Sequence, residues 1–162
     1  MEAIKAWNIP VMPLRGLVVF PHMRLTFDVE RRISIAALER AMTSEQEIFI
    51  VTQRDAAADT PGAGDLFTVG TVSHISQILR LSSVSVRVMV EGRKRAFLRD
   101  ISQTEPFLQA VVEEMEEPEL SEASRNGART EALLRQTWGL FREYAEKLSG
   151  NIAEEIVTAA LD

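Results

Sequence analysis

The sequence predicts an α+β protein, in which a mostly antiparallel β domain packs one helix and is followed by a helical segment. Residues 84–90 place valine at every second position, which is the period of a half-buried strand. Residues 30–43 instead repeat apolar side chains at helical spacing and are rich in alanine. Six glutamates and one proline between residues 113 and 122 mark a change of composition. We therefore expect two parts, a β-rich domain over residues 1–117 and a helical segment over residues 118–162.

The β domain opens with two short apolar runs, each closed by a proline, on either side of Arg15-Gly16. Proline fixes φ and removes a backbone donor, so neither run can continue as a central strand or a helix. We expect a strand at residues 9–12 and then a turn. The next strand, residues 23–29, alternates apolar and polar side chains. The helix of residues 30–43 is then expected to pack on the sheet.

The middle of the chain predicts two strands separated by a loop. The compact apolar run 48–51 fits the interior of a sheet. Residues 54–64 contain proline, glycine and several alanines, a composition typical of an exposed loop. Residues 69–81 form a long strand whose apolar positions do not keep a period of two. We expect a bulge near Ser73-His74, because one inserted residue moves every later side chain to the other face.

The last part of the β domain predicts a hairpin and two more strands. Residues 84–90 pair with the preceding strand across a serine turn at residues 82–83. The Glu-Gly pair at residues 91–92 is expected to end that strand. Further strands are predicted at residues 93–101 and 107–112.

The helical segment carries one apolar stripe. Its members recur at steps of four, three, four and three residues, which places them on one face of a helix: Leu134, Trp138, Phe141, Ala145 and Leu148. Ser121 is predicted to cap the start of this helix and Gly150 to end it. A further helix is expected from Asn151. It reaches Asp162 without a stop signal, so we expect the chain to continue in a longer protein.

Several stretches together resemble the amino-terminal domain of Lon, the ATP-dependent protease. They are residues 10–15 (Pro-Val-Met-Pro-Leu-Arg), 18–23 (Val-Val-Phe-Pro-His-Met), 48–55, 65–72 and 88–96. The resemblance implies a PUA-like fold for the β domain. It also implies a family that degrades damaged or regulatory proteins with ATP. In that family the amino-terminal domain is implicated in recognising substrate polypeptides and in assembling a hexamer.

Composition and charge exclude several classes of function. The net charge of -6 and the pI near 5.1 argue against a sequence-independent nucleic-acid binder, which needs clustered lysine and arginine. The absence of cysteine removes disulfides, thiol catalysis and thiolate metal sites. No apolar run has the roughly 18 residues of a membrane span, and no signal-peptide pattern opens the chain. We expect a cytoplasmic protein that binds neither nucleic acid nor membrane.

No catalytic, cofactor or metal site is predicted. The two histidines, His22 and His74, lie far apart and have no partner at metal-ligand spacing. Neither a phosphate-binding loop with its lysine nor a G-x-S-x-G turn occurs. The glutamates of residues 113–122 are typical of a solvated linker rather than of catalytic carboxylates. We therefore assign neither ATPase nor peptidase activity to this chain.

The remaining candidates are apolar side chains near the proline-closed turn and on the hairpin. The proposed substrate contacts are Val18, Val19, Phe20, Pro21, Met23, Leu79, Leu81 and Met89. The alternative, that these side chains belong to the core, stays open because most apolar residues in short runs are buried. A patch formed by both regions would bind protein rather than a small charged ligand.

Three hypotheses follow for the function. The first is a substrate-recognition module that binds exposed apolar segments of unfolded or damaged proteins. The second is a structural module that organises subunits into a ring through Leu134, Trp138, Phe141 and Leu148. The third is a stand-alone protein with the same fold and another ligand, because a fold does not determine a function. The expected partners are thus unfolded polypeptides or other subunits of the same protein.

Overall fold

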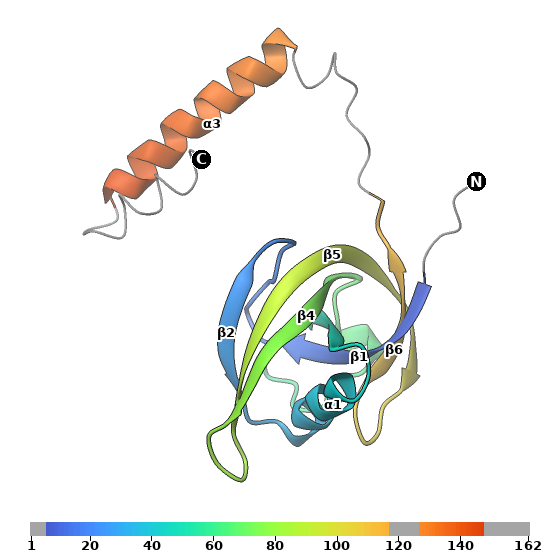
Figure 1. The fold of residues 1–162 in the computed structure, drawn as a ribbon. Coiled ribbons are helices and arrows are strands. Elements are labelled where there is room, and N and C mark those ends of the chain that lie inside the picture. Colours follow the sequence, from blue (N-terminus) through green and yellow to red (C-terminus); the bar gives the residue numbers. More distant parts are fainter. Residues whose placement is uncertain (1–5, 117–126, 148–162) are drawn as a thin grey trace. The chain divides into compact units, whose positions relative to one another are not determined.

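The computed structural model describes residues 6–116 and 127–147 of the 162-residue chain. The chain divides into two compact units, Met1–Glu116 and Glu117–Asp162. The first unit is built from strands and one α-helix, and the described part of the second unit is a single helix (Figure 1). The predicted fold class, mostly antiparallel β structure with few helices, is confirmed.

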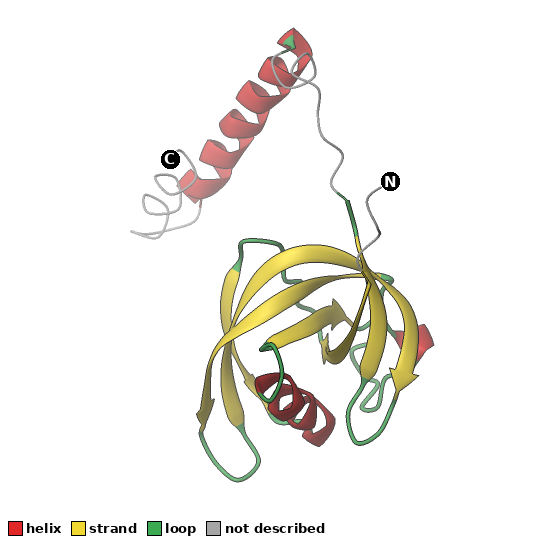
Figure 2. Cartoon of the chain, turned by 45° about the vertical axis from the view of Figure 1, so that its right-hand side comes forward, coloured by secondary structure: helices red, strands yellow, loops and turns green. Residues whose placement is uncertain are grey.

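The strands of the first unit close into a barrel. They are β1 (Ala6–Leu14), β2 (Arg24–Val29), β3 (Glu47–Thr52), β4 (Val69–Arg80), β5 (Val86–Gln103) and β6 (Gln109–Glu114). They pair in the order β2-β5-β4-β3-β1-β6, and β6 pairs again with β5. Pairing among these strands is antiparallel except between β1 and β3. Figure 2 shows them curving around a common interior, with α1 beside it.

Strand β5 joins the two halves of the barrel and is longer than the sequence predicts. Residues 91–92 were expected to end a strand, but β5 runs through them without a break, so that prediction was wrong. Its first half pairs with β2 and its second half with β6, while β4 pairs with both halves. A register shift of β4 on β5 occurs between Val72 and Ser73, where one was predicted, but the extra residue there is Arg93 of β5. The extra residue of β4 is Ser76, at a second shift between Ile75 and Gln77.

The core occupies both faces of β3. Ile48 and Ile50 belong to the cluster that includes α1, whereas Phe49 and Val51 belong to a second cluster on the other face. Because both faces are covered, the strand is apolar at successive positions, as predicted for the interior of the sheet. Helix α1 (Arg32–Met42) contacts β1 and β3. Its buried residues recur at helical spacing: Ser34, Ala37, Leu38 and Ala41.

The described part of the second unit is helix α3 (Ala128–Lys147). It contains most of the predicted apolar stripe. The predicted cap at Ser121, the further helix from Asn151 and the side chain of Leu148 lie outside the described residues. In the part of the chain that the structure describes, no helix is long and apolar enough to cross a membrane.

Candidate functional site

The loop between β1 and β2, residues 15–23, is held by hydrogen bonds to three different strands. Thr52 Oγ1 on β3 donates a hydrogen bond to the Leu17 carbonyl at 2.7 Å. Thr71 Oγ1 on β4 donates to the Val19 carbonyl at 2.6 Å. The backbone N–H of His22 donates to the Gly92 carbonyl on β5 at 2.8 Å. These bonds fix the direction of the loop backbone, and with it the direction of each side chain.

The braced backbone turns alternate side chains outward. Val18 is 49% exposed and Phe20 is 54% exposed, whereas Val19 between them is 4% exposed and packs in the core. The structure therefore corrects the expectation for Val19, which cannot contact a substrate without leaving the core. Pro21 and Met23 are half-buried. Of the predicted contact residues in this loop, Val18 and Phe20 are the two that are exposed.

The loop begins and ends with residues of positive φ. Gly16 has φ of 64° and His22 has φ of 66°. Glycine adopts this conformation freely, but for a residue with a Cβ it costs about 1–2 kcal/mol. The conformation of His22 persists because its N–H bonds to Gly92 and the following N–H, that of Met23, bonds to the Phe20 carbonyl. The loop is thus stabilised by tertiary hydrogen bonds rather than by local preference.

Gly92 lets the loop lie directly against β5. A Cβ placed on Gly92 would be 2.1 Å from the Phe20 carbonyl oxygen, closer than real Cβ atoms approach. The Gly92 N–H also donates to the Met23 carbonyl at 2.9 Å. From the sequence this glycine was predicted to end a strand. In the structure it lies within the strand, and its missing side chain leaves room for the backbone of the loop. Only glycine fits this position.

The hairpin of β4 and β5 forms a second apolar region. Met89 pairs with Gln77, and Leu79 pairs with Arg87 two positions further along. Met89 and Leu79 are therefore diagonal neighbours on the same face, about 7–8 Å apart. Both are exposed, as is Leu81 at the end of the strand. Val84 is also exposed and lies in the turn, so the strand predicted over residues 84–90 begins at Val86 instead.

The loop and Met89 meet opposite faces of β5. Gly92, which carries the loop, shares the inward face of β5 with Val88 and Val90, whereas Met89 faces outward. Gly92 lies three positions along the strand from Met89, a distance of about 10 Å. The exposed candidates therefore fall into two groups. The loop pair is Val18 and Phe20, and the hairpin group is Leu79, Leu81 and Met89.

Charged side chains around Met89 are paired with one another. Arg87 binds the Asp28 carboxylate through two hydrogen bonds of 2.7 and 2.9 Å. These bonds lower the pKa of Asp28 and raise the pKa of Arg87. On the other side, Glu91 lies 3.5 Å from Arg24. Because these charges compensate each other, the surface beside Met89 has little net field to attract a charged ligand.

Three of the four predicted oligomerisation residues lie on α3. Leu134 and Trp138 are exposed and Phe141 is half-buried, while Leu148 is outside the described residues. Sequence reasoning missed three further exposed apolar side chains on this helix: Leu133, Leu140 and Tyr144. These three side chains form a second stripe about 100° around the helix axis from the first, so the apolar face is broader than a single stripe.

The described residues offer no metal site. Among them, no group of three histidine, cysteine, aspartate or glutamate side chains is close enough to hold a metal ion. His22 is exposed in the loop, and His74 lies on β4 between Glu47 and Glu91 of the neighbouring strands.

A family model described as the ATP-dependent protease La (LON) substrate-binding domain matches residues 8–160 of this chain. The chain belongs to this Lon domain family. Lon proteases of three bacteria illustrate the similarity. The protein of Clostridioides difficile is 36% identical over 155 residues, that of Clostridium acetobutylicum 42% over 149, and that of Escherichia coli 40% over 152. These alignments cover 96%, 92% and 94% of this chain and 20%, 18% and 19% of the relatives. The chain thus spans about a fifth of their length.

Solved structures of Lon amino-terminal domains share the fold. The N-terminal domain of Mycobacterium avium complex Lon protease matches 94% of this chain and 74% of its own, with a TM-score of 0.69 and 20% identity. A Lon N-terminal domain protein from Xanthomonas campestris matches 88% of this chain and 73% of its own, with a TM-score of 0.55 and 14% identity. The resemblance to the Lon family is confirmed, and with it the predicted class of β-rich fold.

Proposed function

We propose that this Lon domain recognises protein substrates for an ATP-dependent protease by binding exposed apolar segments of unfolded or damaged polypeptides. The observation that supports the proposal most is that the β1–β2 loop exposes two apolar side chains, Val18 and Phe20, to solvent. Exposed apolar side chains on a braced loop are typical of a surface that contacts another protein. Because the loop is already ordered, little conformational entropy is lost when it binds.

The hairpin group supports the same proposal as an accessory surface. Methionine is flexible and polarisable, so Met89 beside Leu79 can adapt to apolar side chains of different shape. Adaptable contacts over a small area give weak and reversible binding. Such binding suits a domain that passes its substrate onward. Hydrolysis of ATP and of peptide bonds is not assigned to this chain, which spans about a fifth of the relatives that carry the protease name.

The proposal is tested with one polypeptide in two states. Fluorescently labelled lysozyme is used in its native form and in a reduced, alkylated form that cannot refold. We expect the chain to bind the unfolded form at least about tenfold more tightly, because only that form exposes apolar segments. Fluorescence anisotropy measures both affinities. Equal binding of the two forms, or binding of neither, would contradict the proposed function.

A second role, assembly with other subunits, is favoured by α3. Its exposed apolar face would be buried if two such helices packed together. We expect the wild-type chain to increase in mass with concentration in analytical ultracentrifugation, and a Trp138→Ser, Leu134→Ser variant to remain at its smallest mass. The matched control is Arg135→Ser with Arg142→Ser, which changes polar positions of the same helix. If all three chains have the same mass at every concentration, α3 does not drive assembly.

A further inference from the structure

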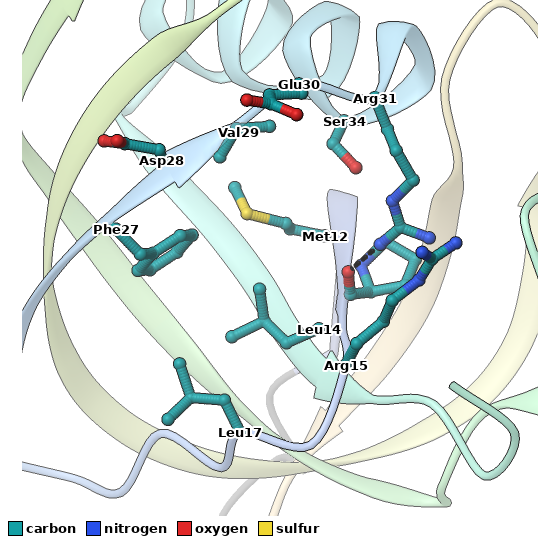
Figure 3. Close-up of a pocket in the computed structure, with 11 residues that line it drawn as sticks. Met12, Leu14, Arg15, Leu17, Phe27, Asp28, Val29, Glu30, Arg31 and Ser34 are labelled. Atoms are coloured by element: carbon teal, nitrogen blue, oxygen red, sulfur yellow. Dashed lines mark hydrogen bonds between the residues drawn. The ribbon is translucent and has the colours of Figure 1, made fainter. Parts of the chain in front are cut away.

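A pocket of about 290 Å³ opens beside the β1–β2 loop, between β1, β2 and the start of α1. Its wall is mainly apolar, and Figure 3 shows the side chains that line it. The apolar lining consists of Met12, Leu14, Leu17, Phe27 and Val29. Leu17 also belongs to the loop that carries Val18 and Phe20, so the pocket borders that loop.

The size of the pocket limits what it can hold. A cavity of about 150 Å³ is enough to bind benzene. The pocket, at about 290 Å³, therefore has room for one large apolar side chain together with the peptide group of the same residue. It is near the lower end of the range for small-molecule sites, which is about 300–1,000 Å³.

A buried hydroxyl without a partner lies in the wall. Ser34, in the first turn of α1, is 2% exposed, and its Oγ has no hydrogen-bond partner among the described residues. Figure 3 shows this oxygen directed toward the interior, between Met12 and the Arg31 guanidinium. An unpaired buried hydroxyl is unfavourable by about 1–3 kcal/mol. A ligand that offers an N–H or C=O group at this point would remove that cost.

Two arginines, Arg31 and Arg15, line one edge of the pocket, and each is bound to other groups of the protein. Arg31 Nη1 donates to Gln53 Oε1 at 2.6 Å, and its Nη2 donates to the Pro13 carbonyl. Burial lowers the pKa of Arg31, and the nearby Arg15 lowers it further. Arg15 is itself paired with Asp59 at 2.7 Å. Both guanidinium groups are thus anchored to the protein.

The charges on the wall balance. Two cations and two anions line the pocket: Arg15, Arg31, Asp28 and Glu30. Asp28 is already bound by Arg87 at 2.7 Å. Since the wall has no net formal charge, a neutral occupant fits it better than an ion, which would lose its hydration without a new counter-charge.

We propose that this pocket receives one large apolar side chain of the substrate polypeptide, while the Ser34 hydroxyl bonds to the peptide group of the same residue. The inference rests on the proposed function, because the occupant is a segment of the bound polypeptide. It adds selectivity to that function. The loop contacts apolar surface in general, whereas the pocket prefers a residue of sufficient size.

The test uses short peptides that differ at one central position: alanine, leucine, phenylalanine or glutamate. We expect the leucine and phenylalanine peptides to bind the wild-type chain about 10- to 100-fold more tightly than the alanine peptide. The glutamate peptide should bind no better than the alanine peptide. Leu17→Trp fills the pocket from its own wall, and it should abolish the preference for leucine and phenylalanine.

Ser34→Ala provides the second variant, since it removes a hydroxyl that has no partner and should leave the chain at least as stable as the wild type. It should bind the leucine and phenylalanine peptides about 3- to 10-fold more weakly than the wild type does. Ser76→Ala, at an exposed position of β4, is the matched control and should change nothing. If all four peptides bound equally and unfolded lysozyme were still bound, the proposed role of the pocket would be overturned and the proposed function would stand. Failure to bind any polypeptide would overturn both.

Discussion

A chain with Val18→Ser and Phe20→Ser is expected to bind unfolded polypeptide at least about tenfold more weakly than the wild type. Burial of a valine or phenylalanine side chain contributes about 1.5–3 kcal/mol, and the two residues are the outward members of the β1–β2 loop. Their replacement should not unfold the chain, because both are exposed and the loop is held through backbone carbonyls. Anisotropy with reduced, alkylated lysozyme measures the affinity, and denaturant unfolding measures the stability.

The matched control for this variant is Met42→Ser. Met42 is also an exposed apolar residue, at 38%, but it ends α1, about 15 Å along the helix from the end that borders the loop. It should bind unfolded lysozyme as the wild type does. If both variants lost affinity equally, binding would depend on general surface hydrophobicity rather than on the loop. If neither lost affinity, the loop would not be the contact site.

Gly92→Ala is expected to destabilise the chain by about 3 kcal/mol and to weaken binding as well. The new methyl group would overlap the Phe20 carbonyl oxygen, so the loop must move away from β5. Overpacking of this kind costs about 1–3 kcal/mol. The movement also strains the hydrogen bonds that His22 and Gly92 make across the junction, each of which contributes about 1 kcal/mol.

The control for the glycine variant is Gly64→Ala. A Cβ at Gly64 would meet no atom within 4 Å, so this change should alter the free energy of unfolding by less than about 0.5 kcal/mol. Urea unfolding of the three chains, followed by circular dichroism, gives the comparison. A Gly92→Ala chain as stable as the Gly64→Ala chain would show that the loop does not depend on close approach to β5.

Local patterns predicted the strands well where burial of the sheet faces sets the order of apolar and polar residues. The alternating valines of residues 86–90 and the apolar run 48–51 both lie in strands, whereas Val84 lies in the turn before β5. The period of two reports one covered face, and the continuous apolar run reports two covered faces. The length of β5 could not be predicted in the same way. Gly92 has the local preferences of a strand ending, and only the approach of the distant Phe20 carbonyl explains why it lies within a strand.

The candidate site could be located from the sequence but not resolved into single residues. The two prolines and the apolar run marked residues 18–23, where the loop proved to be. Whether Val18, Val19 or Phe20 faces water is decided by hydroxyl donors on β3 and β4, more than 30 residues away in the chain. The pocket could not be predicted either, because Leu17, Phe27 and Ser34 come together only when α1 has packed on the sheet.

Chemical-shift mapping on the full chain tests the central claim most directly. Amide resonances of the isotope-labelled chain are followed while unlabelled, reduced and alkylated lysozyme is added. We expect the largest changes at residues 17–23, smaller changes around Met89 and Leu79, and little change at the end of α1 near Met42. Changes confined to α3 would contradict the account, because the polypeptide would then bind the helical unit and not the β1–β2 loop.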